Sequence, residues 1–282
     1  MVSRFKAMNR VHSFQALLCS CIVLLWAAPA SSPAADAERQ RPPATPASSV
    51  HGGQSPSIPS NRSILRQASG RYRYESISDG AVRGAESWQF FAHPDGSRTM
   101  LMWHDLAARQ AQFSVVLRVA ETFRPIEAYV SYWNGGAFKG SSLVRIKDRT
   151  LIASSDGPAG PASHEVQVEQ RFSIGTHPVA GDGWHTWTVA KDAVGVQTTN
   201  LYAMEASADL TKPVLGALAP LSIEYLGPET IEVPAGRFDT IKVRLAGVND
   251  LWITPIDRLV VKSRIAARDL QYVLVESSGR LQ

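Results

Sequence analysis

Apolar and polar residues alternate along most of the chain after about residue 64. Between residues 113 and 119, for example, every second side chain from Phe113 to Val119 is apolar. Successive side chains of a β-strand point to opposite faces, so this alternation predicts strands. Several such segments follow one another, separated by turn sequences such as Asp79-Gly80 and Asn134-Gly135-Gly136. The pattern predicts a mainly β protein with a single antiparallel, open or closed barrel-like sheet and few short helices.

The clearest pair of strands lies between residues 224 and 245. Alternating segments stand on both sides of Pro234-Ala235-Gly236. Proline fixes its own φ and glycine accepts a positive φ, so these three residues favour a tight turn. We therefore expect a β-hairpin here, with Ile231 and Val233 on one face of its first strand.

The sequence from Gly227 to Thr240, with Val233-Pro234-Ala235-Gly236 at its centre, resembles the signature of a family of uncharacterised exported bacterial β-rich proteins. The shared pattern is Gly-x-Glu-x-x-x-Val-Pro-Ala-Gly-x-Phe-x-Thr. The resemblance implies an open or closed β-barrel, a fold that has been compared with carriers that hold acyl chains. It implies no catalytic residue.

The first thirty residues have the pattern of a secretory signal peptide. Arg4, Lys6 and Arg10 precede an apolar run over 14–26, and the small residues Ala28-Pro29-Ala30 follow it. The run is shorter than the ~20 residues of a typical membrane-spanning helix, which favours cleavage over an uncleaved anchor. We therefore expect an exported protein, periplasmic or secreted.

Both cysteines, Cys19 and Cys21, lie within this apolar run. Lipid attachment at Cys21 is disfavoured because the apolar run continues past it. Without the leader the chain has no cysteine, and so neither a disulfide nor a thiolate metal site is expected. We expect contact with a membrane only through an uncleaved or lipidated N-terminus.

Charge gives no support to nucleic-acid binding. The chain has 29 basic and 25 acidic residues, and removal of the three basic residues of the leader leaves 26 (29 − 3) against 25. A nearly neutral mature chain with interspersed charges lacks the excess of basic residues that is typical of nucleic-acid-binding proteins.

Composition divides the rest of the chain into two parts. Residues 31–63 are rich in Pro, Ala, Ser, Gly and Gln and poor in large apolar residues, so they cannot offset the entropy lost on ordering. We expect a disordered linker over 31–63 and one β-rich domain over 64–282.

One candidate for chemistry is the group His177, Asp182 and His185. Two imidazoles and a carboxylate within nine residues can bind a metal or act as an acid–base pair. The alternative is a turn shaped by glycine and proline, in which Asp182 caps the backbone and the histidines make ordinary hydrogen bonds. The spacing matches no known metal motif, and no nucleophile or cofactor motif is present. We therefore expect no cofactor.

A second candidate is a set of large aromatic side chains on the predicted strands and loops. They can line a ligand cavity, or they can simply fill the core, and periodicity does not distinguish the two. The candidate cavity walls are Trp88, Phe90, Trp103, Tyr129, Trp133, Trp184, Trp187 and Trp252.

Together these patterns favour a non-catalytic protein that binds a hydrophobic small molecule or lipid inside a barrel-like sheet. A metal-dependent or acid–base hydrolase that uses His177, Asp182 and His185 is the first alternative. A structural module that pairs its strand edges with a protein partner in the cell envelope is the second.

Overall fold

The computed structural model describes residues 64–282. Fifteen strands and three short 3₁₀ helices follow one another along this part of the chain. The predicted alternation is clearest in β4, in which buried and half-buried side chains alternate without interruption. The elements are β1 (Arg66–Ser76), β2 (Val82–Ala92), β3 (Arg98–Leu106), η1 (Ala107–Arg109), β4 (Ala111–Val119), β5 (Pro125–Asn134), β6 (Ala137–Lys147), β7 (Thr150–Asp156), β8 (Ala162–Gln167), β9 (Phe172–Gly175), η2 (Val179–Thr188), β10 (Val196–Met204), β11 (Gly216–Val233), β12 (Gly236–Leu245), β13 (Asn249–Ile253), β14 (Val260–Ile265), η3 (Ala266–Arg268) and β15 (Leu270–Gly279).

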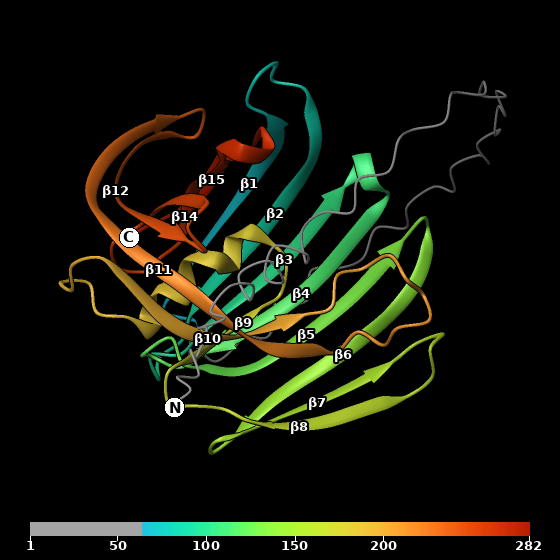
Figure 1. The fold of residues 1–282 in the computed structure, drawn as a ribbon. Helices are drawn as coiled ribbons and strands as arrows, with labels where there is room; N and C mark the ends of the chain where they lie inside the picture. Colours follow the sequence, from blue (N-terminus) through green and yellow to red (C-terminus); the bar gives the residue numbers. More distant parts are fainter. Residues whose placement is uncertain (1–63) are drawn as a thin grey trace, which may run out of the picture.

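All fifteen strands form one sheet in the order β8-β7-β6-β5-β4-β3-β2-β1-β15-β14-β13-β12-β11-β10-β9. Strands that follow one another in sequence therefore pair with each other, except β8 and β9, and the first strand, β1, pairs with the last, β15. The sheet curls strongly but is not closed, because β8 and β9 are its edges (Figure 1). The prediction of a mainly β, barrel-like sheet with few short helices is confirmed. One detail differs, since β9 runs parallel to β10 and makes the sheet mixed.

The two ends of the curled sheet lie close together. The ring of His164 in β8 is 2.6 Å from the Tyr202 hydroxyl of β10, and β9 contacts β5. Tyr202 of β10 and Phe172 of β9, at the end of the sheet opposite β8, are completely buried. Side chains therefore fill the place where a closed barrel would have backbone hydrogen bonds.

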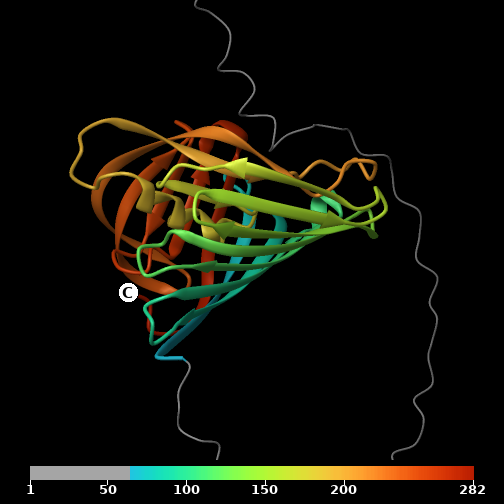
Figure 2. The same ribbon diagram turned by 90° about the horizontal axis from the view of Figure 1, so that it is seen from below.

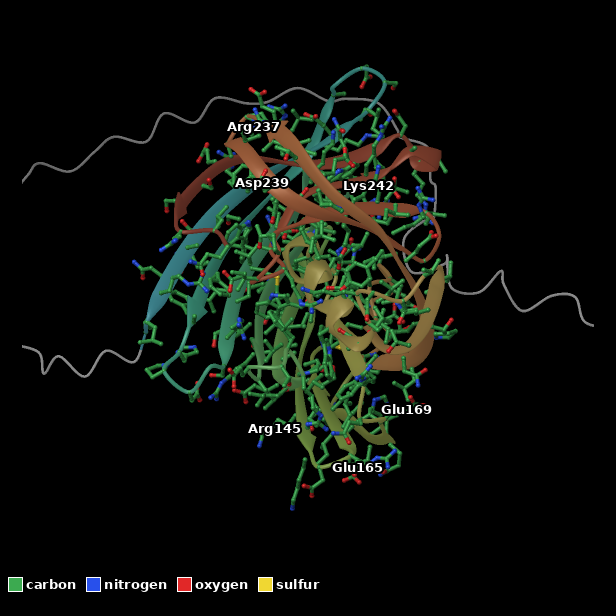
Figure 3. The ribbon with its side chains drawn as sticks, turned by 90° about the vertical axis from the view of Figure 1, so that its left-hand side faces the viewer. Arg145, Glu165, Glu169, Arg237, Asp239 and Lys242 are labelled. Carbon is green, nitrogen blue, oxygen red and sulfur yellow. The ribbon has the colours of Figure 1, made fainter. Side chains whose placement is uncertain are left out.

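The segment η2 occupies the inside of the curl (Figures 1 and 2). Eight of its ten residues are buried, and its Trp184 is among the largest fully buried side chains. The Trp184 ring contacts Phe90 of β2 and Phe123, while its indole N–H donates to the Asp257 carbonyl at 2.9 Å. The interior is thus largely a packed core. Charged side chains such as Arg237 and Glu165 lie at the periphery in Figure 3.

The hairpin predicted from Pro234-Ala235-Gly236 is confirmed as β11–β12. Val233 pairs with Gly236 across the turn, and Ile231 pairs with Phe238. Gly236 has a φ of 134°, which an L side chain rarely adopts. The strand before it is longer than expected and begins at Gly216.

The predicted signal peptide over 1–30, the Cys21 lipidation question and the linker over 31–63 all lie outside the described residues. Within 64–282, no helix has the length and apolar character needed to cross a membrane.

Candidate functional site

The predicted cluster of His177, Asp182 and His185 comes together beside η2. Asp182 and His185 are three residues apart on this 3₁₀ helix, and side chains at that spacing lie above one another. The Nε2 atom of His185 is 3.5 Å from Oδ1 of Asp182. Nδ1 of His185 is 2.6 Å from the Ser173 hydroxyl of β9. His177 precedes the helix in the left-handed region, with a φ of 82°.

Ser173, His185 and Asp182 therefore form a row that resembles a nucleophile with its base and orienting acid. The hydroxyl does not suit that role, because Ser173 is only 3% exposed and is absent from the walls of the neighbouring cavity. The sequence reasoning missed Ser173, which stands in an ordinary strand pattern. Its bond to His185 joins β9 to η2.

A cavity of about 180 Å³ lies between η2 and the surrounding strands, and we call it the inner cavity. Its size is comparable to the ~150 Å³ cavities that bind a benzene-sized guest. Part of its wall is apolar and part is polar. The apolar side chains are Leu106, Val179, Leu201, Ala203, Met204, Ala206, Ile265 and Leu270, and the polar ones are Tyr74, Arg109, His177, Asp182, His185, Asn249, Ser263 and Tyr272.

The wall of the inner cavity contains a buried imidazole. The His177 ring stacks on Phe113 with centroids 4.2 Å apart, and burial lowers the pKa of His177 to about 4. The ring is therefore neutral at pH 7. Its Nδ1 atom is buried and has no hydrogen-bond partner elsewhere in residues 64–282. A buried polar atom of this kind is costly unless something pairs with it.

The carboxyl group of Glu86 binds the backbone at the start of η2. The Glu86 oxygens of β2 accept the backbone N–H groups of Val179 and Ala180 at 2.8 and 2.7 Å. Because the side chain is buried, the pKa of Glu86 is raised to about 8. Glu86 therefore holds η2, and with it Asp182 and His185, against the sheet.

His104 of β3 is the cross-strand neighbour of Glu86, with its Nδ1 atom 3.4 Å from the carboxyl group. Burial lowers the pKa of His104 well below its usual range. The two groups are therefore neutral partners at pH 7, not an ion pair. The Tyr272 hydroxyl lies 3.3 Å from the other ring nitrogen of His104 and continues the buried polar network to the wall of the inner cavity.

Two short turns contribute to the same cavity and were missed by the sequence reasoning. Leu106-Ala107-Ala108-Arg109 connects β3 to β4, and Ile265-Ala266-Ala267-Arg268 connects β14 to β15. Each forms a single 3₁₀ turn that is followed by a left-handed residue. The repeated apolar-Ala-Ala-Arg pattern is the signal that could have revealed them.

The structure does not gather the eight predicted aromatic walls around one cavity, and none of them lines the inner cavity. Trp88, Phe90, Trp184 and Trp252 are buried, the first three in the main core. Trp187 packs partly buried against that core. Trp103 and Tyr129 are each 43% exposed, and Trp133 lies beside Trp103. Strand parity separates these side chains, since even-numbered residues of β2 face inward and odd-numbered residues of β3 face outward.

Metal binding by the histidine cluster has no geometric support in the described part of the chain. Within 64–282, no group of three or more His, Cys, Asp or Glu side chains is arranged to hold a metal ion.

Comparisons with known proteins assign neither a family nor an activity. No protein-family model matches the sequence, and no curated protein matches it. One similar solved structure is a β-barrel-like protein of a domain of unknown function from Brucella abortus, 8% identical, with a TM-score of 0.46 over 76% of this chain and 98% of that chain. Another, from Bacteroides fragilis, has a name that describes an exported protein with a YmcC-like fold. It is 14% identical, with a TM-score of 0.27 over 75% of this chain and 95% of that chain. At these scores neither likeness carries an argument about function.

Proposed function

We propose that this chain is an exported binding protein that holds a small amphipathic molecule in the inner cavity without reacting with it. The observation that carries the proposal is the wall of the inner cavity, in which apolar side chains stand beside polar ones such as Asp182 and Asn249. A guest with one hydrogen-bonding group and an apolar body satisfies both features. Export rests on the leader pattern of the first thirty residues.

The dimensions of the inner cavity narrow the class of guest. A volume of about 180 Å³ is below the ~300–1,000 Å³ of typical drug-sized pockets. It suits a single ring or a short chain, whereas a complete acyl chain would have to extend out of the cavity. Arg109 and Asp182 carry opposite charges on its polar side, which favours a guest of no net charge.

The experiment is extraction of the purified full-length protein with organic solvent, followed by mass spectrometry. Titration with para-cresol, benzyl alcohol and 1-hexanol, read by calorimetry, covers the case in which the guest is lost on purification. We expect a co-purifying molecule or saturable uptake of at least one probe. A protein that carries nothing and takes up none of the three probes contradicts the proposal.

A matched pair of variants locates the binding. Ala203 lines the inner cavity, and its cross-strand neighbour Ala217 does not, although both stand on the same sheet face. Ala203→Trp fills the cavity and should abolish binding, while Ala217→Trp should leave it unchanged. Equal binding by both variants would place the guest elsewhere.

The acid–base alternative has one supporting observation, which is the position of His185 between Ser173 and Asp182. Hydrolysis of para-nitrophenyl acetate by the wild-type protein, compared with Ser173→Ala, separates it from binding alone. Hydrolysis that depends on Ser173 would favour the enzyme.

A further inference from the structure

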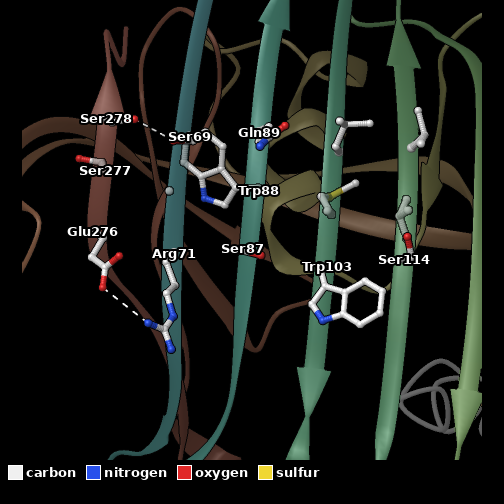
Figure 4. A pocket seen from close by; sticks show the side chains of 15 residues that line it. Ser69, Arg71, Ser87, Trp88, Gln89, Trp103, Ser114, Glu276, Ser277 and Ser278 are labelled. Atoms are coloured by element: carbon white, nitrogen blue, oxygen red, sulfur yellow. Dashed lines mark hydrogen bonds and ion pairs between the residues drawn. The ribbon is translucent and has the colours of Figure 1, made fainter. Parts of the chain in front are cut away.

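A second and larger depression lies on the opposite, outward face of the sheet, and we call it the outer groove. It crosses β15, β1, β2, β3 and β4 and has a volume of about 670 Å³ (Figure 4). This volume is within the ~300–1,000 Å³ of typical ligand sites. Because it is on the other side of the sheet from η2, it shares no lining residue with the inner cavity.

The floor of the outer groove combines hydroxyl side chains with apolar ones, among them Leu101 and Val116. Ser87, Trp103 and Ser114 stand in one cross-strand row on β2, β3 and β4. The Ser69 and Ser278 hydroxyls lie 2.8 Å apart in the neighbouring row. Each hydroxyl both donates and accepts. The floor therefore offers a series of hydrogen-bonding groups across adjacent strands, which lie ~4.8 Å apart.

One wall of the outer groove is aromatic. Trp103 is 43% exposed, and its ring stands beside the serines in Figure 4. The row continues over the same outer face through Trp133, 6.1 Å from Trp103, to Phe138, 5.5 Å further on. Large aromatic side chains exposed on the outside of a sheet, with no core to fill, are typical of binding surfaces.

The charged residues of the outer groove neutralise each other. Arg71 and Glu276 lie at one end with their charged atoms 3.6 Å apart, and they are the only charged side chains among its lining residues. The groove thus has no net charge to attract a polyanion. An acyl chain would leave the serine hydroxyls without partners, which is unfavourable.

From this geometry we infer that the outer groove binds a neutral glycan chain. A pyranose ring has apolar C–H faces that stack on an aromatic ring, whose face is electron-rich, and hydroxyl groups around its edge that pair with serine, Gln89 and Arg71. Trp103 is the stacking platform, and Ser87 and Ser114 are the hydrogen-bonding floor. This site is independent of the small-molecule guest proposed for the inner cavity.

The test is affinity electrophoresis of the purified full-length protein in native gels. The gels contain a soluble mixed-linkage β-glucan, glycogen, a galactomannan or a mannan. We expect retardation by at least one of these neutral polysaccharides, with at least a tenfold loss of affinity in Trp103→Ala and an intermediate loss in Trp103→Phe. The double variant Ser87→Val with Ser114→Val should lose affinity while keeping the platform. Leu226→Ala, at a similarly exposed apolar position on β11, is the matched control and should bind as the wild type does.

Three results would overturn the inference. The first is free migration of the wild-type protein in all four polysaccharides, and the second is retardation that Trp103→Ala leaves intact. The third is Trp103-dependent binding to phosphatidylcholine vesicles in place of glycan. Circular dichroism of each variant confirms that a loss of binding is not a loss of folding, since removal of an exposed side chain changes stability little.

Discussion

Glu86 gives the protein a predictable dependence of stability on pH. Its carboxyl group is buried beneath the start of η2 and has a pKa of about 8, against 4.5 when unperturbed. Between these values the folded chain holds a proton that the unfolded chain has released. Stability from this group is therefore complete below about pH 4.5 and is lost as the pH rises through about 8.

The size of this loss of stability follows from the pKa shift of Glu86. With ~1.36 kcal/mol per pKa unit, the loss between about pH 6.5 and about pH 8.5 amounts to about 2 kcal/mol of unfolding free energy. Below about pH 6.5 the buried imidazoles of His177 and His104 have the opposite effect, because they make stability fall as the pH falls. The pKa of His177 is lowered to about 4 and that of His104 well below its usual range, so the unfolded chain binds more protons on these two groups. We expect maximal stability near pH 6.5.

The assay is urea unfolding of the full-length protein, followed by tryptophan fluorescence at a series of pH values. Glu86→Gln cannot ionise, and so the decline above about pH 6.5 should disappear. The variant should also be less stable by about 1–3 kcal/mol at the optimum, because an amide has one oxygen for two backbone N–H groups. Glu169→Gln, at an exposed position after β8, is the control and should keep the decline. A wild-type free energy that stays level or rises toward pH 8.5, or a decline that survives in Glu86→Gln, would refute the reasoning.

Two further predictions concern the packing around η2, each read by thermal unfolding. A Cβ at Gly183 would lie 1.9 Å from the Arg258 carbonyl oxygen, whereas one at Gly181 would meet only side-chain atoms at 3.6–3.7 Å. Gly183→Ala should therefore cost about 3 kcal/mol and Gly181→Ala much less, and equal losses would contradict this packing. Asp257 is completely buried and accepts two hydrogen bonds from Arg66, so Asp257→Ala should cost about 3 kcal/mol or more. A change below about 0.5 kcal/mol would show that the pair does not hold β1 to the loop before β14.

The sequence was sufficient for features that depend on neighbours along the chain. Alternation predicted β4, and the turn chemistry of Pro234-Ala235-Gly236 predicted the β11–β12 hairpin. The start of η2 at Val179 is a feature of the other kind, because it depends on a distant residue. The Glu86 oxygens hold this first turn from another part of the chain, and no local pattern records this contact.

The site was only partly predictable for the same reason. His177, Asp182 and His185 were found because they are close in sequence. The rest of the inner cavity comes from β1, β3, β9, β10 and β13–β15, which converge only after the sheet curls. One signal was present, however, because Glu86 has the same strand parity as Trp88 and Phe90. A carboxylate on the apolar face of a strand indicates a buried group with backbone partners.

The pairing of β1 with β15 makes the described strands a nearly circular series, in which the hydrogen-bonded order is interrupted only between β8 and β9. Ala68, near the start of β1, and Gly279, the last residue of β15, are direct cross-strand partners. The centre of the sheet therefore cannot be completed until the last strand has been synthesised. Two half-sheets, β1–β8 and β9–β15, can assemble from local contacts, and their union has to wait for a contact across some two hundred residues.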